Sequence, residues 1–375
     1  MPYNKNRGEW SEFYALAKLL ERGELIAGYG EPGAAEQRYA LHAVAKSPDG
    51  FRYRRQGDYI IALRCEGGLL VPVDPAEFPP IPLAALSTAA RVFMTEIQEG
   101  AGRAFACPLS ESFFSEQLRC PLIPTAAGVK RDISFSYLQG GTPQPEELGF
   151  SIKSYLGGRP SLVNASHSTR FVFDVEGMSL KAALAHNEIA DIRARVIALR
   201  KSGTLSYKGV MHNRQFQLNL AIVESHLHYL LAELLLCHFS GHGSWFSEIE
   251  IENAEPRLYG NCPQTADFSL VKFRMAIQSY LRAASLGMVP RKAWDGWPTA
   301  EGGYLIVKSD GELVGILGGF AERLGKFLYD HCYLETPSTS KWHYGTVYEH
   351  NGTPKIMLAL QVRIAPKRHT AALPN

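Results

Sequence analysis

Two short segments, DISFSY (residues 132–137) and GFSIK (residues 149–153), decide the fold of this chain. Polar and apolar residues alternate in both, which is the pattern of a half-buried β-strand. The alternation places Asp132 on the polar face of the first strand, and it places Ser151 and Lys153 together on one face of the second. The intervening QGGTPQPEE (residues 139–147) cannot continue a strand. The two segments are therefore predicted to pair as a hairpin.

An acidic residue on one strand beside a polar-x-Lys tripeptide on the next is the layout of the nuclease fold written PD-(D/E)xK. Two neighbouring strands can aim both side chains at one metal ion and one phosphate. Ser151 stands where that pattern expects a second acid. The alternative interpretation, solvated residues on a sheet face, remains open on these residues alone.

The rest of the chain predicts a mixed α/β (α+β) protein. Apolar residues recur at helical spacing in five segments, namely residues 9–21, 83–99, 178–201, 216–238 and 266–286. Short strands are expected between residues 24 and 75 and after Pro290, where Asp310-Gly311 and Asn351-Gly352 are hairpin turn signals. We expect a mixed sheet core flanked by helices in residues 1–176, a helical section in residues 177–290, and a β-rich section in residues 291–375.

Composition indicates an ordered globular chain. Of 375 residues, 46% are hydrophobic, and 39 basic residues nearly cancel 37 acidic ones. Six scattered cysteines without a Cys-x-x-Cys pair disfavour disulfides and a zinc site. The glycines form no dinucleotide fingerprint. The chain shows neither a signal peptide nor a run of 18 apolar residues, so a cytoplasmic location is expected.

Five longer sequence blocks favour the nuclease interpretation of Asp132, Ser151 and Lys153 over that of solvated residues on a sheet face. They are GEWSEFYALAKLLERGEL (8–25), LGFSIKSYLGGRPSLVNASHSTRF (148–171), WDGWPTAEGGYLIVKSDGELV (294–314), LETPSTSK (334–341) and YGTVYEHNGTPKIMLALQVRI (344–364). Together, and in this order, they resemble the HpaII-type restriction endonuclease family. Residues 309–324 depart from the family pattern, so contacts carried there are not transferred.

The resemblance implies a Type II enzyme that hydrolyses one phosphodiester in each strand of a short palindromic site in duplex DNA, with Mg²⁺. The family archetype reads CCGG. A palindromic site matches a two-fold symmetric protein, so a homodimer is expected. A cognate DNA methyltransferase that protects the host's own sites is expected as well.

Phosphodiester hydrolysis gives the candidate residues definite roles. Mg²⁺ prefers oxygen ligands and keeps several waters, so one or two carboxylates suffice. Asp132 is the first metal-binding candidate, and Glu12 or Glu9 of the predicted first helix is the second, with Glu12 facing further inward. Glu146 and Glu147 are the alternative, but they are expected to be solvated.

The same chemistry assigns roles to the second strand. The Lys153 ammonium could position the attacking water and stabilise the developing charge. The Ser151 hydroxyl could hold a metal-bound water, although it is a poor direct ligand.

Three polar segments are candidates for DNA contact. Arginine suits the edge of guanine, and hydroxyls with lysine suit the backbone. A turn cap is the alternative interpretation of the first segment. The candidate residues are Asn164, Ser166, Arg170, Asn213, Arg214, Ser338, Thr339, Ser340 and Lys341.

Three classes of function remain in competition. The first is the endonuclease itself. The second is a sequence-specific DNA-binding protein of the same fold that does not cleave, which Ser151 in the acidic position suggests. The third, an α/β protein that never meets DNA, is opposed by the resemblance.

Overall fold

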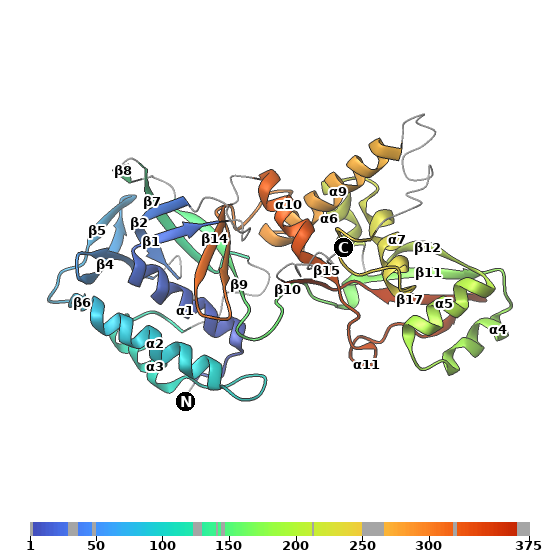
Figure 1. The fold of residues 1–375 in the computed structure, drawn as a ribbon, viewed down its shortest axis with the longest axis horizontal. Coiled ribbons are helices and arrows are strands. Elements are labelled where there is room, and N and C mark those ends of the chain that lie inside the picture. The colour runs from blue at the N-terminus through green and yellow to red at the C-terminus, as the bar shows by residue number, and fades with distance from the viewer. Residues whose placement is uncertain are drawn as a thin grey trace, which may run out of the picture. The chain divides into compact units, whose positions relative to one another are not determined.

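The computed structural model describes residues 3–28, 37–46, 50–122, 130–139, 142–143, 147–211, 214–249, 266–317 and 321–365. The chain divides into two compact units, and Figure 1 labels most of their elements. Unit 1 consists of Met1–Pro160 and Pro298–Leu324, and unit 2 consists of Ser161–Trp297 and Gly325–Asn375. The predicted boundaries at residues 176 and 290 differ from this division, because strand pairing and not chain order defines each unit.

Unit 1 is built on one mixed sheet. Its strands are β1 (Glu24–Ala27), β2 (Gln37–Ala45), β3 (Arg52–Gln56), β4 (Tyr59–Glu66), β5 (Leu69–Pro72), β6 (Ile81–Pro82), β7 (Ile133–Gln139), β8 (Thr142–Pro143), β9 (Leu148–Ser154), β13 (Gly303–Val307) and β14 (Leu313–Leu317). Neighbouring strands follow the order β5-β4-β3-β2-β1-β14-β13-β9-β7-β8, and β2 also pairs with β7. The β1–β14 and β13–β9 pairs are parallel. The predicted mixed sheet core is confirmed.

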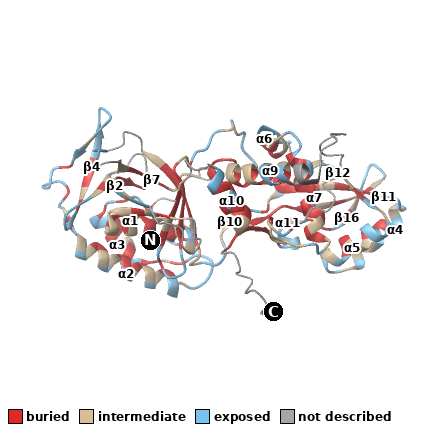
Figure 2. Cartoon of the chain, turned by 45° about the horizontal axis from the view of Figure 1, so that its top comes forward, coloured by how far each residue is buried: buried red, intermediate tan, exposed pale blue. Residues whose placement is uncertain are grey.

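Helix α1 (Arg7–Arg22) packs against this sheet. It contacts β1, β2, β3, β9, β13, β14 and α2 (Leu83–Glu99), so it is covered from several sides. Its residues Trp10 and Phe13 are fully buried. Figure 2 colours each residue by its burial, with buried positions in red. Asn6 and Glu9 form a reciprocal capping box at its start, and Gly23 ends it in the left-handed conformation. The predicted helix over residues 9–21 is confirmed, as is the helix over 83–99.

The predicted pairing of the two deciding segments is confirmed. β7 and β9 are antiparallel, with Ile133 opposite Phe150 and Phe135 opposite Leu148. The rings of Phe135 and Phe150 stack at 4.0 Å on the core face. The prediction of a half-buried first strand was wrong, because residues 133–136 are all buried. β7 lies between β2 and β9, and its serines are covered by neighbouring side chains.

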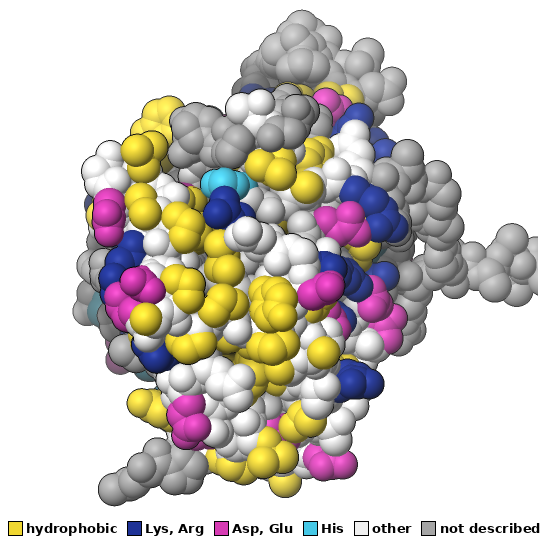
Figure 3. All heavy atoms as spheres, turned by 90° about the vertical axis from the view of Figure 1, so that its left-hand side faces the viewer, with side chains coloured by type: hydrophobic (Ala, Val, Ile, Leu, Met, Phe, Trp, Pro, Cys, Tyr) yellow, Lys and Arg dark blue, Asp and Glu magenta, His cyan; other side chains and the backbone are white. Residues whose placement is uncertain are grey.

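The free edge of the unit 1 sheet is apolar. β5 ends the strand order, and its sequence LLVP carries no charge. Tyr59, Leu69 and Val71 are exposed on β4 and β5. Figure 3 looks onto this side of unit 1, where apolar side chains gather between charged ones. Strand β5 itself therefore lacks the Lys and Arg that phosphate binding uses.

Unit 2 contains two smaller antiparallel sheets with helices around them. The strands are β10 (Ser161–Val163), β11 (Arg170–Glu176), β12 (Thr204–Val210), β15 (Cys332–Leu334), β16 (Val347–His350), β17 (Thr353–Ala359) and β18 (Val362–Ile364), in the orders β12-β11-β17-β16 and β10-β18-β15. The helices include α4 (Leu180–Ala185), α5 (Ile192–Ser202), α6 (Gln215–Val223), α7 (Leu227–Phe239), α9 (Ala266–Leu286) and α11 (Thr339–Trp342), and α10 (Ala321–His331) begins in unit 1 and continues into unit 2. The hairpin predicted at Asn351-Gly352 joins β16 and β17, and both turn residues have positive φ.

Two predicted helices are each divided in the structure. Residues 178–201 form α4 and α5, separated by a short 3-10 turn at His186–Glu188 and by Asp191, which caps α5. Residues 216–238 form α6 and α7. The chain becomes extended at Glu224, so the two helices meet at 106°. Both breaks fall on short polar stretches, His186-Asn187-Glu188 and Glu224-Ser225-His226, and apolar residues at helical spacing lie on either side of each, which is why periodicity alone did not reveal them.

Among the described residues, no single helix is long and apolar enough to cross a bilayer. Helices α6 and α7 taken together reach the necessary length and apolar composition, but they are bent at 106°.

Candidate active site

The Asp132 carboxylate is fixed by the strand next to it. Its Oδ2 accepts a hydrogen bond from the Ile152 backbone N–H at 2.7 Å and one from the Ser151 hydroxyl at 3.2 Å. The Asp132 N–H donates to the Phe150 carbonyl at 2.8 Å. Ser151 is buried, so it supports the aspartate from the position where the nuclease pattern expects an acid. Asp132 and Ser151 therefore meet as the sequence predicts.

Lys153 lies two residues beyond Ser151 on the same face of β9. It is only partly exposed, and its Nζ lies 5.7 Å from the centre of the Tyr304 ring. Tyr304 is on β13, which pairs with β9 in parallel and places Ser151 opposite Tyr304. The aromatic ring limits where the ammonium can lie.

The carboxylate of Glu12 reaches the same region from α1. Lys46, immediately after β2, donates to Glu12 Oε2 at 2.8 Å and to the Asp132 carbonyl oxygen at 2.9 Å. Burial raises the pKa of Glu12, and the negative charge of Asp132 adds to this shift, whereas the Lys46 ammonium opposes it. The Lys46 ammonium therefore contacts both the Glu12 carboxylate and the Asp132 backbone.

Glu9 is engaged elsewhere on α1. Its carboxylate accepts the Asn6 backbone N–H at 2.8 Å, which completes the capping box. Glu12 has no such role in the helix cap, and it faces inward as expected from the sequence. We therefore keep Glu12, and not Glu9, as the second carboxylate of the proposed site.

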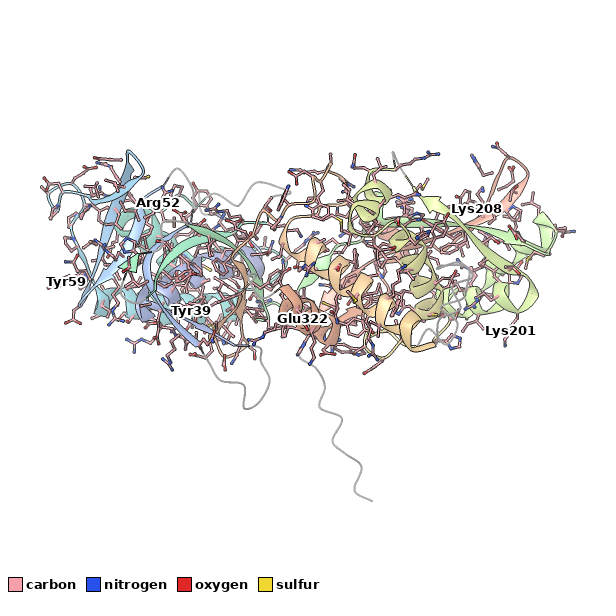
Figure 4. All side chains as sticks on the ribbon, turned by 90° about the horizontal axis from the view of Figure 1, so that it is seen from above. Tyr39, Arg52, Tyr59, Lys201, Lys208 and Glu322 are labelled. Atoms are coloured by element: carbon pink, nitrogen blue, oxygen red, sulfur yellow. The ribbon has the colours of Figure 1, made fainter. Side chains whose placement is uncertain are left out.

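Glu147, which was expected to be solvated, is partly exposed and is paired with two arginines. It accepts a hydrogen bond from Arg52 Nε at 3.1 Å and lies 3.4 Å from a terminal nitrogen of Arg131. Arg52 is on β3 and is labelled in Figure 4. The paired arginines hold this acid in place beside β9. Glu146 lies outside the described residues.

Two cations were missed because they precede the aspartate and belong to no motif. Lys130 lies near Asp132 and Lys153, and burial lowers its pKa to about 8, with a further lowering from the Lys153 charge and an opposing effect of Asp132. Arg131 donates to Ser134 Oγ at 2.7 Å. A Cβ on Gly149 would lie 2.6 Å from the Arg131 side chain, so a larger residue there would require Arg131 to move. The pair Lys130-Arg131 directly before Asp132 was the signal available in the sequence.

The donor set suits a hard cation that needs few protein ligands. Among the described residues, no group of three or more His, Cys, Asp and Glu is placed to hold a metal ion. Asp132 and Glu12 supply two carboxylates, and Mg²⁺ commonly binds to one or two carboxylates with water in its other positions. Lys153 brings positive charge to the same face. The arrangement can bind a divalent cation and a phosphate together.

The candidates that follow β10 lie in unit 2 and differ in exposure. Asn164 is exposed, whereas Ser166 takes part in a turn in which its N–H donates to Thr169 Oγ1 at 2.9 Å. Arg170 is buried and donates to the His343 carbonyl at 3.3 Å. Burial lowers the pKa of Arg170. Arg170 could contact a base directly only if the residues that bury it moved.

The loop that carries Ser338, Thr339, Ser340 and Lys341 exposes all four. The Tyr344 hydroxyl anchors it by donating to the Pro337 carbonyl at 2.6 Å. The Ser338 hydroxyl accepts the Lys341 N–H at the start of α11. These exposed hydroxyls and the lysine are available for contact with a polar partner.

The buried side chain of His238 contacts the segment that leads into the Ser338–Lys341 loop. His238 Nε2 lies 3.0 Å from Thr336 Oγ1, and its Nδ1 lies 3.0 Å from Ser244 Oγ. Burial lowers the pKa of His238 to about 4, and the Arg193 charge contributes. The histidine is neutral at pH 7, and its role is structural. Arg214, at the start of α6, has positive φ, and Asn213 lies outside the described residues.

Comparison with known proteins identifies the family of the chain. The model of the HpaII restriction endonuclease family matches residues 6–364. The chain belongs to this family. The Type II restriction enzyme HpaII of Haemophilus parainfluenzae is 28% identical to it over 366 residues, which cover 96% of this chain and 98% of that enzyme. No solved structure matches the chain.

Membership in the HpaII restriction endonuclease family confirms the resemblance read from the sequence blocks. The protein is a restriction enzyme, a Type II site-specific deoxyribonuclease, and it acts on double-stranded DNA. Restriction endonucleases generally use a divalent metal ion, which is consistent with the carboxylate pair of unit 1.

Proposed function

We propose that this restriction enzyme hydrolyses DNA at CCGG with Mg²⁺, using Asp132, Glu12 and Lys153. The observation that carries the proposal is the position of Asp132. Its carboxylate is held by Ile152 N–H and Ser151 Oγ, immediately before Lys153 on the paired strand. The proposal accounts for a polar cluster at the edge of an otherwise apolar core.

Asp132 and Glu12 would hold the metal ion. When bound, Mg²⁺ neutralises the non-bridging phosphate oxygens and lowers the pKa of a coordinated water. Asp132 is anchored by hydrogen bonds from two neighbouring groups, so its direction is set before DNA binds. Such preorganisation avoids reorganisation cost during the reaction.

Lys153 would hold the scissile phosphate and orient the attacking water through its ammonium protons. It is the lysine that lies on the same face of β9 as Ser151. The Ser151 hydroxyl donates to Asp132 and would keep that carboxylate turned toward the phosphate. Each of these roles uses a group whose position the strands β7 and β9 determine.

Unit 2 would supply contacts that select the site. Asn164, Ser166 and the loop from Ser338 to Lys341 offer amide, hydroxyl and ammonium donors. Hydroxyls and lysine position the DNA backbone, and side chains that reach base edges select the sequence. Arg170, Asn213 and Arg214 remain candidates for the same surface. We also propose that two copies act together on the palindrome, and that a cognate methyltransferase protects the host's sites.

Digestion of a sequenced, unmethylated plasmid tests the proposed function. With Mg²⁺, we expect cuts at CCGG and nowhere else, placed symmetrically on the two strands because the site is palindromic. End-mapping of the fragments measures both the site and the cut position. A plasmid of the same length without CCGG is the control. Reproducible cuts at another sequence would refute the specificity but leave the Mg²⁺ mechanism standing.

A further inference from the structure

A buried lysine outside the nuclease pattern connects the carboxylate of Glu12 with the backbone of Asp132. The Lys46 side chain is only 3% exposed. Its Nζ donates to Glu12 Oε2 at 2.8 Å and to the Asp132 carbonyl oxygen at 2.9 Å. It also lies 5.2 Å from the centre of the Phe13 ring. One ammonium therefore contacts α1 and the residue that leads into β7.

Strand register explains how Lys46 comes to this position. Lys46 directly follows β2, and the last residue of β2, Ala45, pairs with Ser134 of β7. The antiparallel direction brings the chain after Ala45 alongside the chain before Ser134, which includes Asp132. The β2–β7 pairing therefore places Lys46 beside Asp132, and α1 carries Glu12.

Burial of this ion pair has a cost that hydrophobic packing would avoid. A buried lysine and carboxylate lose hydration, and apolar residues of similar volume at such positions are often as stabilising. An ion pair that stays partly exposed loses less hydration. Lys18 and Glu21, on the same helix, are such a pair: they lie 2.5 Å apart with both side chains partly exposed. A buried pair beside the candidate site is therefore better explained by a function than by stability.

We infer that Lys46 is a positioning residue, which holds the Glu12 carboxylate at a set distance from the Asp132 segment so that both can bind one divalent cation. This inference rests on the proposed function. Groups that orient metal ligands commonly change metal affinity or activity by about 10- to 100-fold when they are replaced. Lys46 would act through Glu12 and would not touch the DNA.

Binding of Mn²⁺ to the full-length protein, followed by electron paramagnetic resonance, tests this inference without relying on cleavage. We compare wild type with Lys46→Met, Glu12→Gln, the double variant, and Lys18→Met as a matched control that removes a partly exposed lysine partner from a glutamate of α1. We expect about 10- to 100-fold weaker Mn²⁺ binding for Lys46→Met and no change for Lys18→Met. The Mg²⁺ concentration for half-maximal cleavage should rise in parallel.

The double variant separates a positioning role from a general structural one. If Lys46 acts through Glu12, then Glu12→Gln with Lys46→Met should bind Mn²⁺ as weakly as Glu12→Gln alone. Because the double variant buries no unpaired charge, it also gives an answer if Lys46→Met does not fold. A further loss in the double variant, or Mn²⁺ binding by Lys46→Met that is unchanged or tighter, would overturn the inference.

The proposed function can fail separately. If Asp132→Asn loses Mn²⁺ binding and cleavage while Lys46→Met keeps both, the proposed site stands and Lys46 has no positioning role. If Asp132→Asn keeps both, the proposed metal site itself is wrong.

Discussion

Replacement of Asp132 by asparagine is expected to reduce the single-turnover rate of CCGG cleavage by at least about 10³-fold, or roughly 4 kcal/mol of transition-state stabilisation. Asparagine has nearly the same shape, and its side-chain oxygen can still accept the hydrogen bonds from Ile152 N–H and Ser151 Oγ. What the variant loses is the negative charge that a metal ion requires. Folding should therefore change little, and the measurement is a quenched time course with a labelled duplex.

Asp74→Asn is the matched control for this variant. Asp74 also lies in unit 1, and its carboxylate accepts a backbone N–H, that of Ala76, at 2.8 Å. It is exposed and distant in sequence from β7 and β9. Its cleavage rate should equal that of wild type. If Asp132→Asn cleaves at a rate within a factor of a few of this control, the catalytic role of Asp132 is refuted.

Replacement of Lys153 by methionine is expected to slow cleavage by about 10²- to 10³-fold while duplex binding persists. Methionine keeps most of the length of the side chain and can still pack against the Tyr304 ring, but it removes the charge that we assign to the phosphate and the water. Cleavage is measured with Mg²⁺, and binding is measured by fluorescence anisotropy with a labelled CCGG duplex in the absence of metal.

Lys308→Met provides the comparison for Lys153. Lys308 directly follows β13, the strand paired with β9, and it is exposed. We expect it to lose little cleavage. Equal losses in the two variants would show that general positive charge on this sheet matters, and not the position of Lys153. Loss of binding together with cleavage in Lys153→Met would reassign the lysine from catalysis to DNA affinity.

Much of the first unit was predictable because its signals are local. The alternation of β7 and β9 and the helical spacing of α1 and α2 each arise within one short segment. In unit 2, the predicted turn at Asn351-Gly352 likewise depends on two adjacent residues. The five sequence blocks, which occur in the same order as in the family, then linked these segments to the HpaII restriction endonuclease family.

Other features could not be read from the sequence because they depend on pairing between distant segments. The β2–β7 register brings Lys46 beside Asp132 across 86 positions of the chain. Arg170 resembled an exposed DNA contact, but β11 pairs on both sides and the residue is buried. The division of residues 216–238 into two helices depends on one extended residue, Glu224, in a short polar stretch between two apolar segments of helical spacing. In each case, tertiary packing determined what local spacing left open.

Cleavage of the protein backbone by bound iron tests most directly whether Asp132, Glu12 and Lys153 surround one divalent cation. Fe²⁺ is loaded into the full-length enzyme, hydroxyl radicals are generated with ascorbate and peroxide, and the fragment ends are identified by mass spectrometry. We predict ends near residues 12, 46, 132 and 151–153, suppressed by excess Mg²⁺ and absent from Asp132→Asn. Ends that cluster elsewhere in the chain, with those segments intact, would contradict this active site.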